Sequence, residues 1–169
     1  MRRLLTAAIL WIPMVSAIAQ TSDPPKEIAD LSWMVGTWSG TGKNVYDGKE
    51  TPFTTSMTVS RYGQTIQAVS TLTPPNGVEL ILTRMIGWDA VKRQYVSYTF
   101  SNMAGLPLIS RGTLTNNKLV MLFDKWGTDT TKVGRETMSK ISDTKYGFRT
   151  EMRHDKKWEV QMDMVLQKI

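Results

Sequence analysis

The sequence contains no cysteine and only one histidine, His154. Without cysteine there is no disulfide, no thiolate nucleophile and no cysteine metal site. The single histidine lies in a charged run, residues 154–157, which offers little for building a nucleophile held beside a base. Nothing groups the ligands that a metal ion needs. We therefore expect a protein that is not an enzyme, with no catalytic residue and no metal site.

Long apolar runs are also scarce, and the one that is present lies at the N-terminus. Arg2 and Arg3 precede the apolar stretch 4–15, which is too short for a membrane span. The small-x-small pattern of residues 17–19 follows it. These features predict a signal peptide over residues 1–19 and a single domain over residues 20–169. We expect a secreted or periplasmic protein with no stable membrane insertion after cleavage.

Basic residues are in modest excess and do not form a cluster. The formal net charge of +6 falls to +4 when the two arginines of the predicted signal peptide are removed. The remaining lysines and arginines are scattered, and no basic block alternates with aromatic residues as in nucleic-acid-binding domains. We expect no nucleic-acid partner, and the sequence leaves the oligomeric state open.

Residues from 37 onward alternate between apolar and polar side chains, with turn signals roughly every eight to twelve residues. Asp47-Gly48 and Asn116-Asn117 suit tight hairpins. The predicted strands are 37–46, 51–61, 65–73, 78–88, 94–102, 108–115, 118–125, 131–141, 145–153 and 158–168, with longer connections at 103–107 and 127–129. A meander of about ten strands leaves two exposed edges unless it closes. We predict an all-β, up-and-down antiparallel β-barrel.

A short helix should close one end of this barrel. Residues 24–33 favour one or two helical turns, with Asp23 as the N-cap and Pro24 at the first helical position. Leu31, Trp33 and Trp38 would then seal that end.

Alternation within the strands predicts which side chains point inward. The predicted inward sets are Phe53, Thr55, Met57 and Val59; Val96, Tyr98 and Phe100; Tyr146, Phe148, Thr150 and Met152; and Trp158, Val160, Met162, Met164 and Leu166. These sets would line the barrel with aromatic and methionine side chains.

Arg84 interrupts an apolar strand face, because it alternates with Leu82 and Ile86. A buried arginine is costly unless it is paired. Two interpretations remain open. The guanidinium either reaches solvent or pairs with an inward acid such as Glu136, or it binds an anionic group inside a ligand cavity together with Tyr98.

Two further charged features are weaker. Arg61 extends the face of residues 53–59 but lies beside a turn. Glu136 and Glu151 lie on adjacent late strands, where cross-strand pairing with Arg135 or Arg149 explains them more simply than paired catalytic carboxylates.

Two stretches resemble the calycin superfamily of barrels. Residues 31–42, LSWMVGTWSGTG, contain a Gly-x-Trp signature and are similar to the leader of nitrobindin-like barrels. A second set is similar to a bacterial family of exported domains of unknown function: Ile86-Gly87-Trp88-Asp89, Tyr95, Phe100 to Met103, and Gly112-Thr113-Leu114. The resemblance covers most of residues 28–168 and implies a calycin, lipocalin- or nitrobindin-like barrel.

The same resemblance implies roles for two further features. Trp38 would close one barrel end and pack against a basic residue of a late strand, which could be Arg149, Arg153 or Lys168. Gly40 and Gly42 share the parity of Trp38 and suit a crowded or bent strand.

Heme is the cofactor that the resemblance raises, because nitrobindins hold heme through a histidine of the last strand. The matching region here reads Val160-Gln161-Met162-Asp163, without a histidine. Met162 and Met164 are candidate iron ligands, but methionine on an inward strand face is usually part of the core. We expect no cofactor, with heme as the less favoured alternative.

Ligand binding without catalysis is the function that these residues favour. Small barrels often enclose one apolar ligand, and methionine adapts to variable apolar shapes. The predicted ligand is small and apolar or amphiphilic, an anionic head group being one option, and the predicted ligand-binding residues are Arg84, Tyr98, Met57, Phe148, Met152, Met162 and Met164. The alternative is a barrel packed by its own side chains that acts as an interaction module of the cell envelope.

Overall fold

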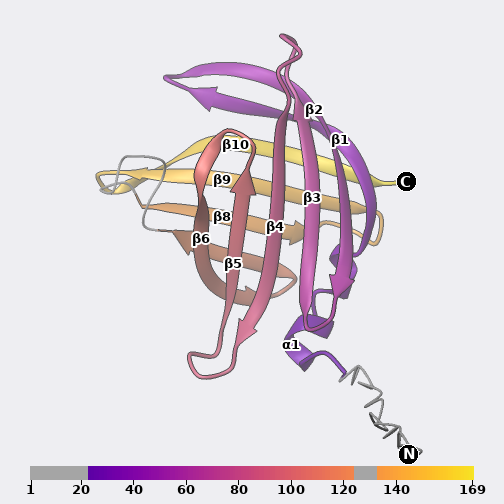
Figure 1. Ribbon diagram of the computed structural model, residues 1–169. Helices are drawn as coiled ribbons and strands as arrows, with labels where there is room; N and C mark the ends of the chain where they lie inside the picture. Colours follow the sequence, from indigo (N-terminus) through magenta and orange to yellow (C-terminus); the bar gives the residue numbers. More distant parts are fainter. Residues whose placement is uncertain (1–22, 124–132) are drawn as a thin grey trace, which may run out of the picture.

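Within residues 23–123 and 133–169, which a computed structural model describes, ten antiparallel strands close into a barrel (Figure 1). The strands are β1 (Gly36–Tyr46), β2 (Lys49–Tyr62), β3 (Thr65–Thr73), β4 (Leu80–Asp89), β5 (Gln94–Ser101), β6 (Ala104–Thr115), β7 (Lys118–Phe123), β8 (Gly134–Lys140), β9 (Lys145–His154) and β10 (Lys157–Lys168). Each strand pairs with its neighbours in the sequence, and β1 pairs with β10 to close the sheet. The predicted up-and-down barrel is confirmed.

Most strand boundaries follow the turn chemistry of the sequence. Asp47 and Gly48 have φ of 49° and 70°, and Asn116 and Asn117 have φ of 49° and 59°, as tight hairpins require. The predicted connection 103–107 is wrong, because β6 begins at Ala104 and extends that hairpin. The other predicted connection, 127–129, and the predicted signal peptide lie outside the described residues.

One end of the barrel is closed by α1 (Lys26–Ala29) and the 3-10 turn η1 (Ser32–Met34) (Figure 1). The predicted N-cap, Asp23, is wrong: the cap is Pro25, whose carbonyl accepts hydrogen bonds from the N–H groups of Ile28 and Ala29. A residue that precedes proline avoids the helical region, so Pro24 cannot begin the helix. No helix among the described residues is both long and apolar enough to cross a membrane.

The helical plug seals the barrel as predicted. Leu31 and Trp38 are almost fully buried, and Trp33 packs on Tyr146 with ring centroids 5.7 Å apart. The Trp38 Nε1 donates a hydrogen bond to the Met34 carbonyl at 2.8 Å. The basic residue on Trp38 is Lys168, whose Nζ lies 5.4 Å from the ring centroid.

Two glycines of β1 allow the strands to approach closely beside this plug. A Cβ at Gly40 would lie 2.1 Å from the Val165 carbonyl oxygen, and one at Gly42 would lie 2.5 Å from the Phe53 ring. Since neither space accepts a side chain, the expected crowding of this strand is confirmed.

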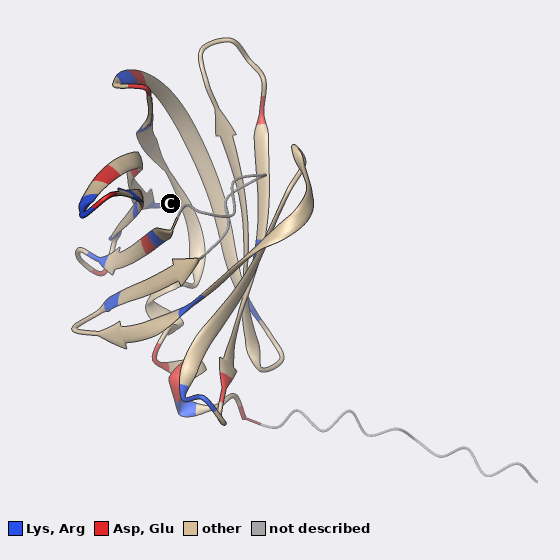
Figure 2. Cartoon of the chain, turned by 90° about the vertical axis from the view of Figure 1, so that its left-hand side faces the viewer, with Lys and Arg blue, Asp and Glu red and all other residues tan. Residues whose placement is uncertain are grey.

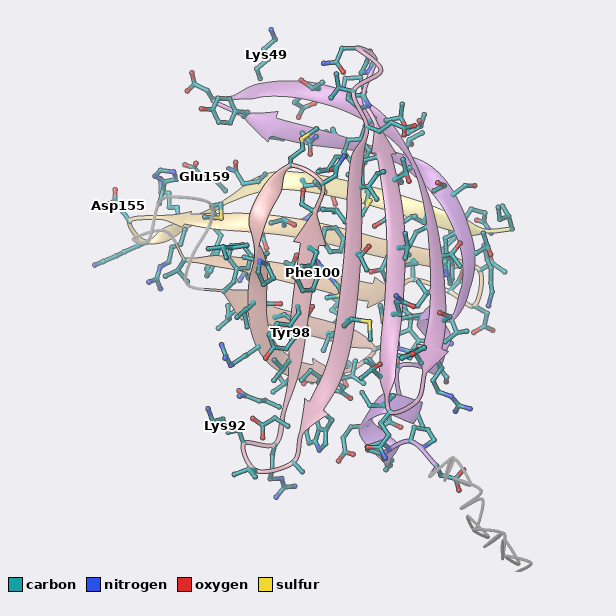
Figure 3. All side chains as sticks on the ribbon, viewed as in Figure 1. Lys49, Lys92, Tyr98, Phe100, Asp155 and Glu159 are labelled. Atoms are coloured by element: carbon teal, nitrogen blue, oxygen red, sulfur yellow. The ribbon has the colours of Figure 1, made fainter. Side chains whose placement is uncertain are left out.

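The predicted inward face of β5 is wrong. Tyr95, Ser97 and Thr99 point into the barrel, whereas Tyr98 and Phe100 are 43% and 50% exposed on the outer wall (Figure 3). The alternation has the predicted period, but the apolar face is the outer one. On the inner face, Thr99 accepts a hydrogen bond from the buried guanidinium of Arg84 on β4.

The predicted inward set of β10 is wrong in part, because this strand contains a β-bulge. The pairing with β9 shifts between Val160 and Met162, so Met162 lies opposite Thr150 whereas Val160 lies opposite Glu151. One extra residue inverts the parity of the strand segment before it. Met162, Met164 and Leu166 therefore point inward, whereas Trp158 and Val160 belong to the outer wall.

Candidate functional site

A small chamber lies inside the barrel beside the helical plug. Its volume is about 30 Å³, and its lining is Met34, Met57, Ala68, Ser70, Leu82, Arg84, Met138, Tyr146, Phe148 and Met164. This volume accepts one or two water molecules. Ligand sites typically have volumes of about 300–1,000 Å³, so the chamber must enlarge before it accepts an organic ligand.

Arg84 is the one charged side chain of this lining, and it crosses the interior from β4 to β8. Its Nε donates to Thr99 Oγ1 at 2.9 Å, and its Nη2 donates to Glu136 Oε1 at 2.5 Å. Its Nη1 lies 3.4 Å from the Met138 sulfur. The guanidinium also lies 5.3 Å from the centroid of the Phe148 ring. Of the two interpretations of Arg84, pairing with an inward acid is confirmed.

Glu136 of β8 is the acidic partner, and it is almost fully buried. Its second carboxylate oxygen lies 3.4 Å from the Ser110 hydroxyl. Ser97, on the strand between those of Arg84 and Ser110, is fully buried, and its hydroxyl has no hydrogen-bond partner among the described residues. The interior thus carries one ion pair within a set of hydroxyl groups.

The inner hydroxyl residues of β5, Ser97 and Thr99, are the residues that sequence reasoning missed. Ser97 and Thr99 alternate along β5 with large apolar side chains, and this alternation was the signal that could have found them. The signal was ambiguous because a polar face of a strand normally faces solvent.

The structure brings together four of the seven predicted site residues: Arg84, Met57, Phe148 and Met164 line the chamber. Met152 is buried and Met162 is half-buried, but both lie outside the chamber lining. Tyr98 does not belong to the site. Its neighbour Thr99 pairs with Arg84, so Tyr98 points to the opposite side of the sheet.

A second ion pair lies on the outer wall and involves Arg135, the residue of β8 that precedes Glu136. Arg135 donates from Nε and Nη2 to the two carboxylate oxygens of Glu151, at 2.6 Å and 3.1 Å. This hydrogen bonding raises the pKa of Arg135. The Arg135 guanidinium also stacks on Trp158, 4.3 Å from the ring centroid. Glu136 and Glu151 thus face opposite sides of the sheet and do not form a carboxylate pair.

The outer wall of β7 to β10 also has a hollow of about 460 Å³, which is larger than the inner chamber. Its lining includes Arg135 with Glu151 and Arg149 with Asp163, and the second pair is 2.8 Å apart. The hydrogen bond to Asp163 raises the pKa of Arg149. Because these four charges pair with one another, together they add no net charge to the hollow.

Two buried tyrosines are held neutral. Burial raises the pKa of Tyr146, which lines the chamber. Burial, followed by the charges of Asp30 and Glu27, raises the pKa of Tyr95 to about 12. The Tyr95 hydroxyl donates to the Glu27 carbonyl at 2.8 Å and ties the plug to β5. Both phenols therefore contribute packing and dipoles, not charge, at neutral pH.

Polar groups elsewhere do not assemble into a metal site among the described residues: no three histidine, aspartate or glutamate side chains come close enough to hold an ion. His154 lies exposed at the end of β9, and Asp155 follows it with φ of 52°.

The comparisons with known proteins agree with this architecture. The family model described as "THAP4-like, heme-binding beta-barrel domain" matches residues 27–168. A solved structure, Rv2717c from M. tuberculosis, is similar with a TM-score of 0.66 and 14% sequence identity, covering 87% of this chain and 99% of that chain. At this identity the similarity shows the fold alone. No curated protein matches the sequence.

The family description bears directly on the cofactor. The expectation of no cofactor is not supported, because the matching family is described as heme-binding. The described interior nevertheless does not fit heme: its chamber is about 30 Å³, and its lining contains methionine sulfur but no imidazole. The single histidine is exposed at the end of β9.

The match extends over most of the chain, and the closed barrel has the nitrobindin-like form that residues 31–42 led us to expect. The relation to the exported bacterial family stays a prediction. The protein belongs to the THAP4-like, heme-binding beta-barrel domain family.

Proposed function

We propose that the barrel binds one small, mostly apolar ligand in the chamber between the helical plug and Arg84, without catalysis. One observation carries the proposal: a buried guanidinium lines the chamber, and among the described residues its Nη1 finds only a thioether sulfur as hydrogen-bond acceptor. Thioether sulfur is a weak acceptor, whereas a guanidinium has five N–H donors.

The energetic reason is that the Arg84 guanidinium is buried away from water with an incomplete set of good hydrogen-bond acceptors. A buried polar group without a good partner costs about 1–3 kcal/mol. A ligand oxygen beside Nη1 would recover part of that cost, and the apolar remainder of the ligand would gain by burial against methionine and aromatic side chains. The polar end and the apolar walls together have the residue chemistry of small-molecule sites, in which a few polar groups orient a ligand among apolar side chains.

The chamber can enlarge through rotamer changes of its methionine side chains. Four of its lining residues are methionines: Met34, Met57, Met138 and Met164. Methionine has three rotatable bonds and fills irregular space, so rotamer changes can open the chamber without moving the backbone. A leucine or phenylalanine lining would be stiffer.

Binding is tested by isothermal titration calorimetry and native mass spectrometry with six-carbon probes: 1-hexanol, hexanamide and hexanoate. We expect one probe molecule per barrel, and we expect Arg84→Met to abolish or strongly weaken binding. Arg149→Met is the matched control, because it removes the same side chain from the outer wall. If no probe binds to the folded wild-type protein, the proposal is wrong.

Heme is tested in parallel by titrating hemin and recording the Soret band. We expect no shifted Soret band. The described lining presents no imidazole to iron, and the volume of the chamber is only about 30 Å³. A stoichiometric shifted band would replace the small-ligand proposal with the ligand of the family description.

The exposed apolar side chains of the outer wall favour a second candidate function, an interaction module. Val69, Ile81, Tyr98, Phe100 and Ile109 are all more than a third exposed on β3 to β6. The strands β3 and β5 carry no charged residue, and long uncharged segments of strand are visible in Figure 2. The apolar side chains of this wall suit an apolar partner surface, and a two-fold dimer would pair the wall with an identical one.

Self-association tests this second candidate. Sedimentation equilibrium of the wild-type protein should show a dimer that is lost in a Tyr98→Ser, Phe100→Ser variant. A wild-type monomer at all accessible concentrations would exclude the dimer.

We also propose that the chain is exported, on the support of residues 1–19 alone. Fractionation of cells that produce the full chain, with N-terminal sequencing, should recover a product beginning at Gln20 outside the cytoplasm. A full-length product in the cytoplasm would contradict export.

A further inference from the structure

The charge of the barrel interior bears on which ligand the chamber selects. Of the buried charged residues among those described, two face inward, Arg84 and Glu136. They form one ion pair at 2.5 Å, so the inner site has no net charge. The third, Glu151, belongs to the outer wall, where it pairs with Arg135.

An anionic ligand would disturb this balance. A carboxylate beside Arg84 would compete with Glu136 for one guanidinium and would leave a net negative charge in an apolar interior. An uncompensated buried charge is far more costly than a buried hydrogen-bonding group that is neutral. The balance therefore opposes anions, although an arginine taken alone would suggest an anion site.

A neutral acceptor faces no such penalty. The Arg84 Nη1 lies 3.4 Å from the Met138 sulfur, which both a carbonyl and a hydroxyl oxygen would replace as a stronger acceptor. The Nε and Nη2 bonds to Thr99 and Glu136 can remain, because they use other N–H groups. The Arg84–Glu136 ion pair thus stays intact while an Nη1 N–H group donates to the ligand.

We propose that Glu136 is a specificity-determining residue that makes the barrel select neutral ligands carrying one hydrogen-bond acceptor, such as amides, ketones, esters or alcohols, over carboxylates. This inference rests on the proposed binding in the chamber. It favours a neutral head group over the anionic one that the sequence left as an option, and it names Arg84 Nη1 as the donor.

The first test needs no variant. Hexanamide and hexanoate have the same chain and nearly the same head-group shape, and at pH 7.5 only hexanoate is charged. Calorimetry on the wild-type protein should give a Kd for hexanamide at least about tenfold below that for hexanoate, a difference of about 1.4 kcal/mol. Equal or tighter binding of hexanoate would overturn the inference while leaving the proposed function standing.

Two variants sharpen the test. Glu136→Gln removes the balancing charge, so the preference should move toward hexanoate by at least tenfold relative to the wild-type ratio. Met138→Leu nearly conserves side-chain volume, a change that usually costs less than about 1.5 kcal/mol, and it removes the competing sulfur. It should tighten hexanamide binding several-fold and keep the neutral preference.

Each outcome has a distinct meaning. An unchanged ratio of the two affinities in folded Glu136→Gln overturns the role of Glu136. If Glu136→Gln does not fold, the wild-type ratio and Met138→Leu still decide whether the chamber selects neutral acceptors through Arg84 Nη1. If neither probe nor 1-hexanol binds to the folded wild-type protein, the proposed function fails, and the inference that rests on it fails too.

Discussion

Two neighbouring residues of β8 show how differently one kind of interaction is used on the two sides of the sheet. Glu136 points inward and pairs with Arg84, whereas Arg135 points outward and pairs with Glu151. The inner side chains are 9% and 4% exposed, and the outer ones are 34% and 11% exposed. The two ion pairs have nearly equal lengths, 2.5 Å and 2.6 Å, so distance alone does not distinguish them.

The two ion pairs differ in their surroundings. The inner pair joins β4 to β8 across the interior, and neither charge has bulk water to replace a lost partner. The outer pair joins adjacent strands and adds a stacking contact on Trp158. We infer that the inner pair dominates stability and ligand selection, whereas the outer pair fixes the start of β10 beside its bulge.

The largest effect should come from breaking the inner pair on one side. Arg84→Met leaves the Glu136 carboxylate buried without its partner, which should lower the free energy of unfolding by about 3–5 kcal/mol. Urea unfolding followed by tryptophan fluorescence measures this change. Arg149→Met, which breaks an exposed pair, should cost no more than about 1 kcal/mol. Equal losses in the two variants would show that the inner pair is no more important than a surface pair.

The next effect should appear when both inner charges are removed. Arg84→Met combined with Glu136→Leu should recover most of the loss, because replacing a buried ion pair with apolar side chains is often close to neutral. Recovery should be incomplete, since the Ser110 hydroxyl loses its acceptor. A double-mutant cycle measures the coupling. Additive losses would mean that the two charges do not interact in solution.

A smaller effect should follow from removal of the outer arginine. Arg135→Ala loses the stacking on Trp158 and the hydrogen bonds to Glu151, whose side chain is only 11% exposed, so the change should cost about 1–3 kcal/mol. High salt screens exposed charges, so 1 M NaCl, at which the screening length is about 3 Å, should shrink this loss but not that of Arg84→Met. A salt-independent Arg135→Ala loss would assign the effect to packing.

The smallest effect belongs to a surface ion pair, Lys140 with Asp143, whose side chains are 29% and 90% exposed. The hydrogen bond from Lys140 lowers the pKa of the Asp143 carboxyl below its ordinary value of 3.8. A lowered folded-state pKa contributes stability above the ordinary value, and that stability is lost as the pH falls through the folded-state pKa. The thermal midpoints of wild type and Lys140→Ala should differ slightly at pH 7 and converge at about pH 2. A difference that grows toward acid pH would contradict this sign.

Reading a face from alternation worked where the opposite face was polar and failed where it was not. On β2, polar residues separate Phe53, Met57 and Val59, and all three are buried as predicted. On β5 the outer face is apolar and the inner face holds Ser97 and Thr99, so the same rule selected the wrong side. The candidate site was affected most, because Tyr98 was assigned to it and Thr99 was left out.

The amino-acid sequence was sufficient to predict the class of fold, most strand boundaries within the described residues, the hairpin turns and the tryptophan-sealed plug. Local residue chemistry decides these features: positive φ at Asp47 and Asn116, side-chain period along a strand, and the room that Gly40 leaves beside β10. Only the tertiary structure decided which face is inside, where the bulge of β10 falls and which partner Arg84 takes. Arg84 and Glu136 are 52 residues apart, and their contact depends on the closure of the whole barrel. No local pattern encodes that closure or the volume that it leaves inside.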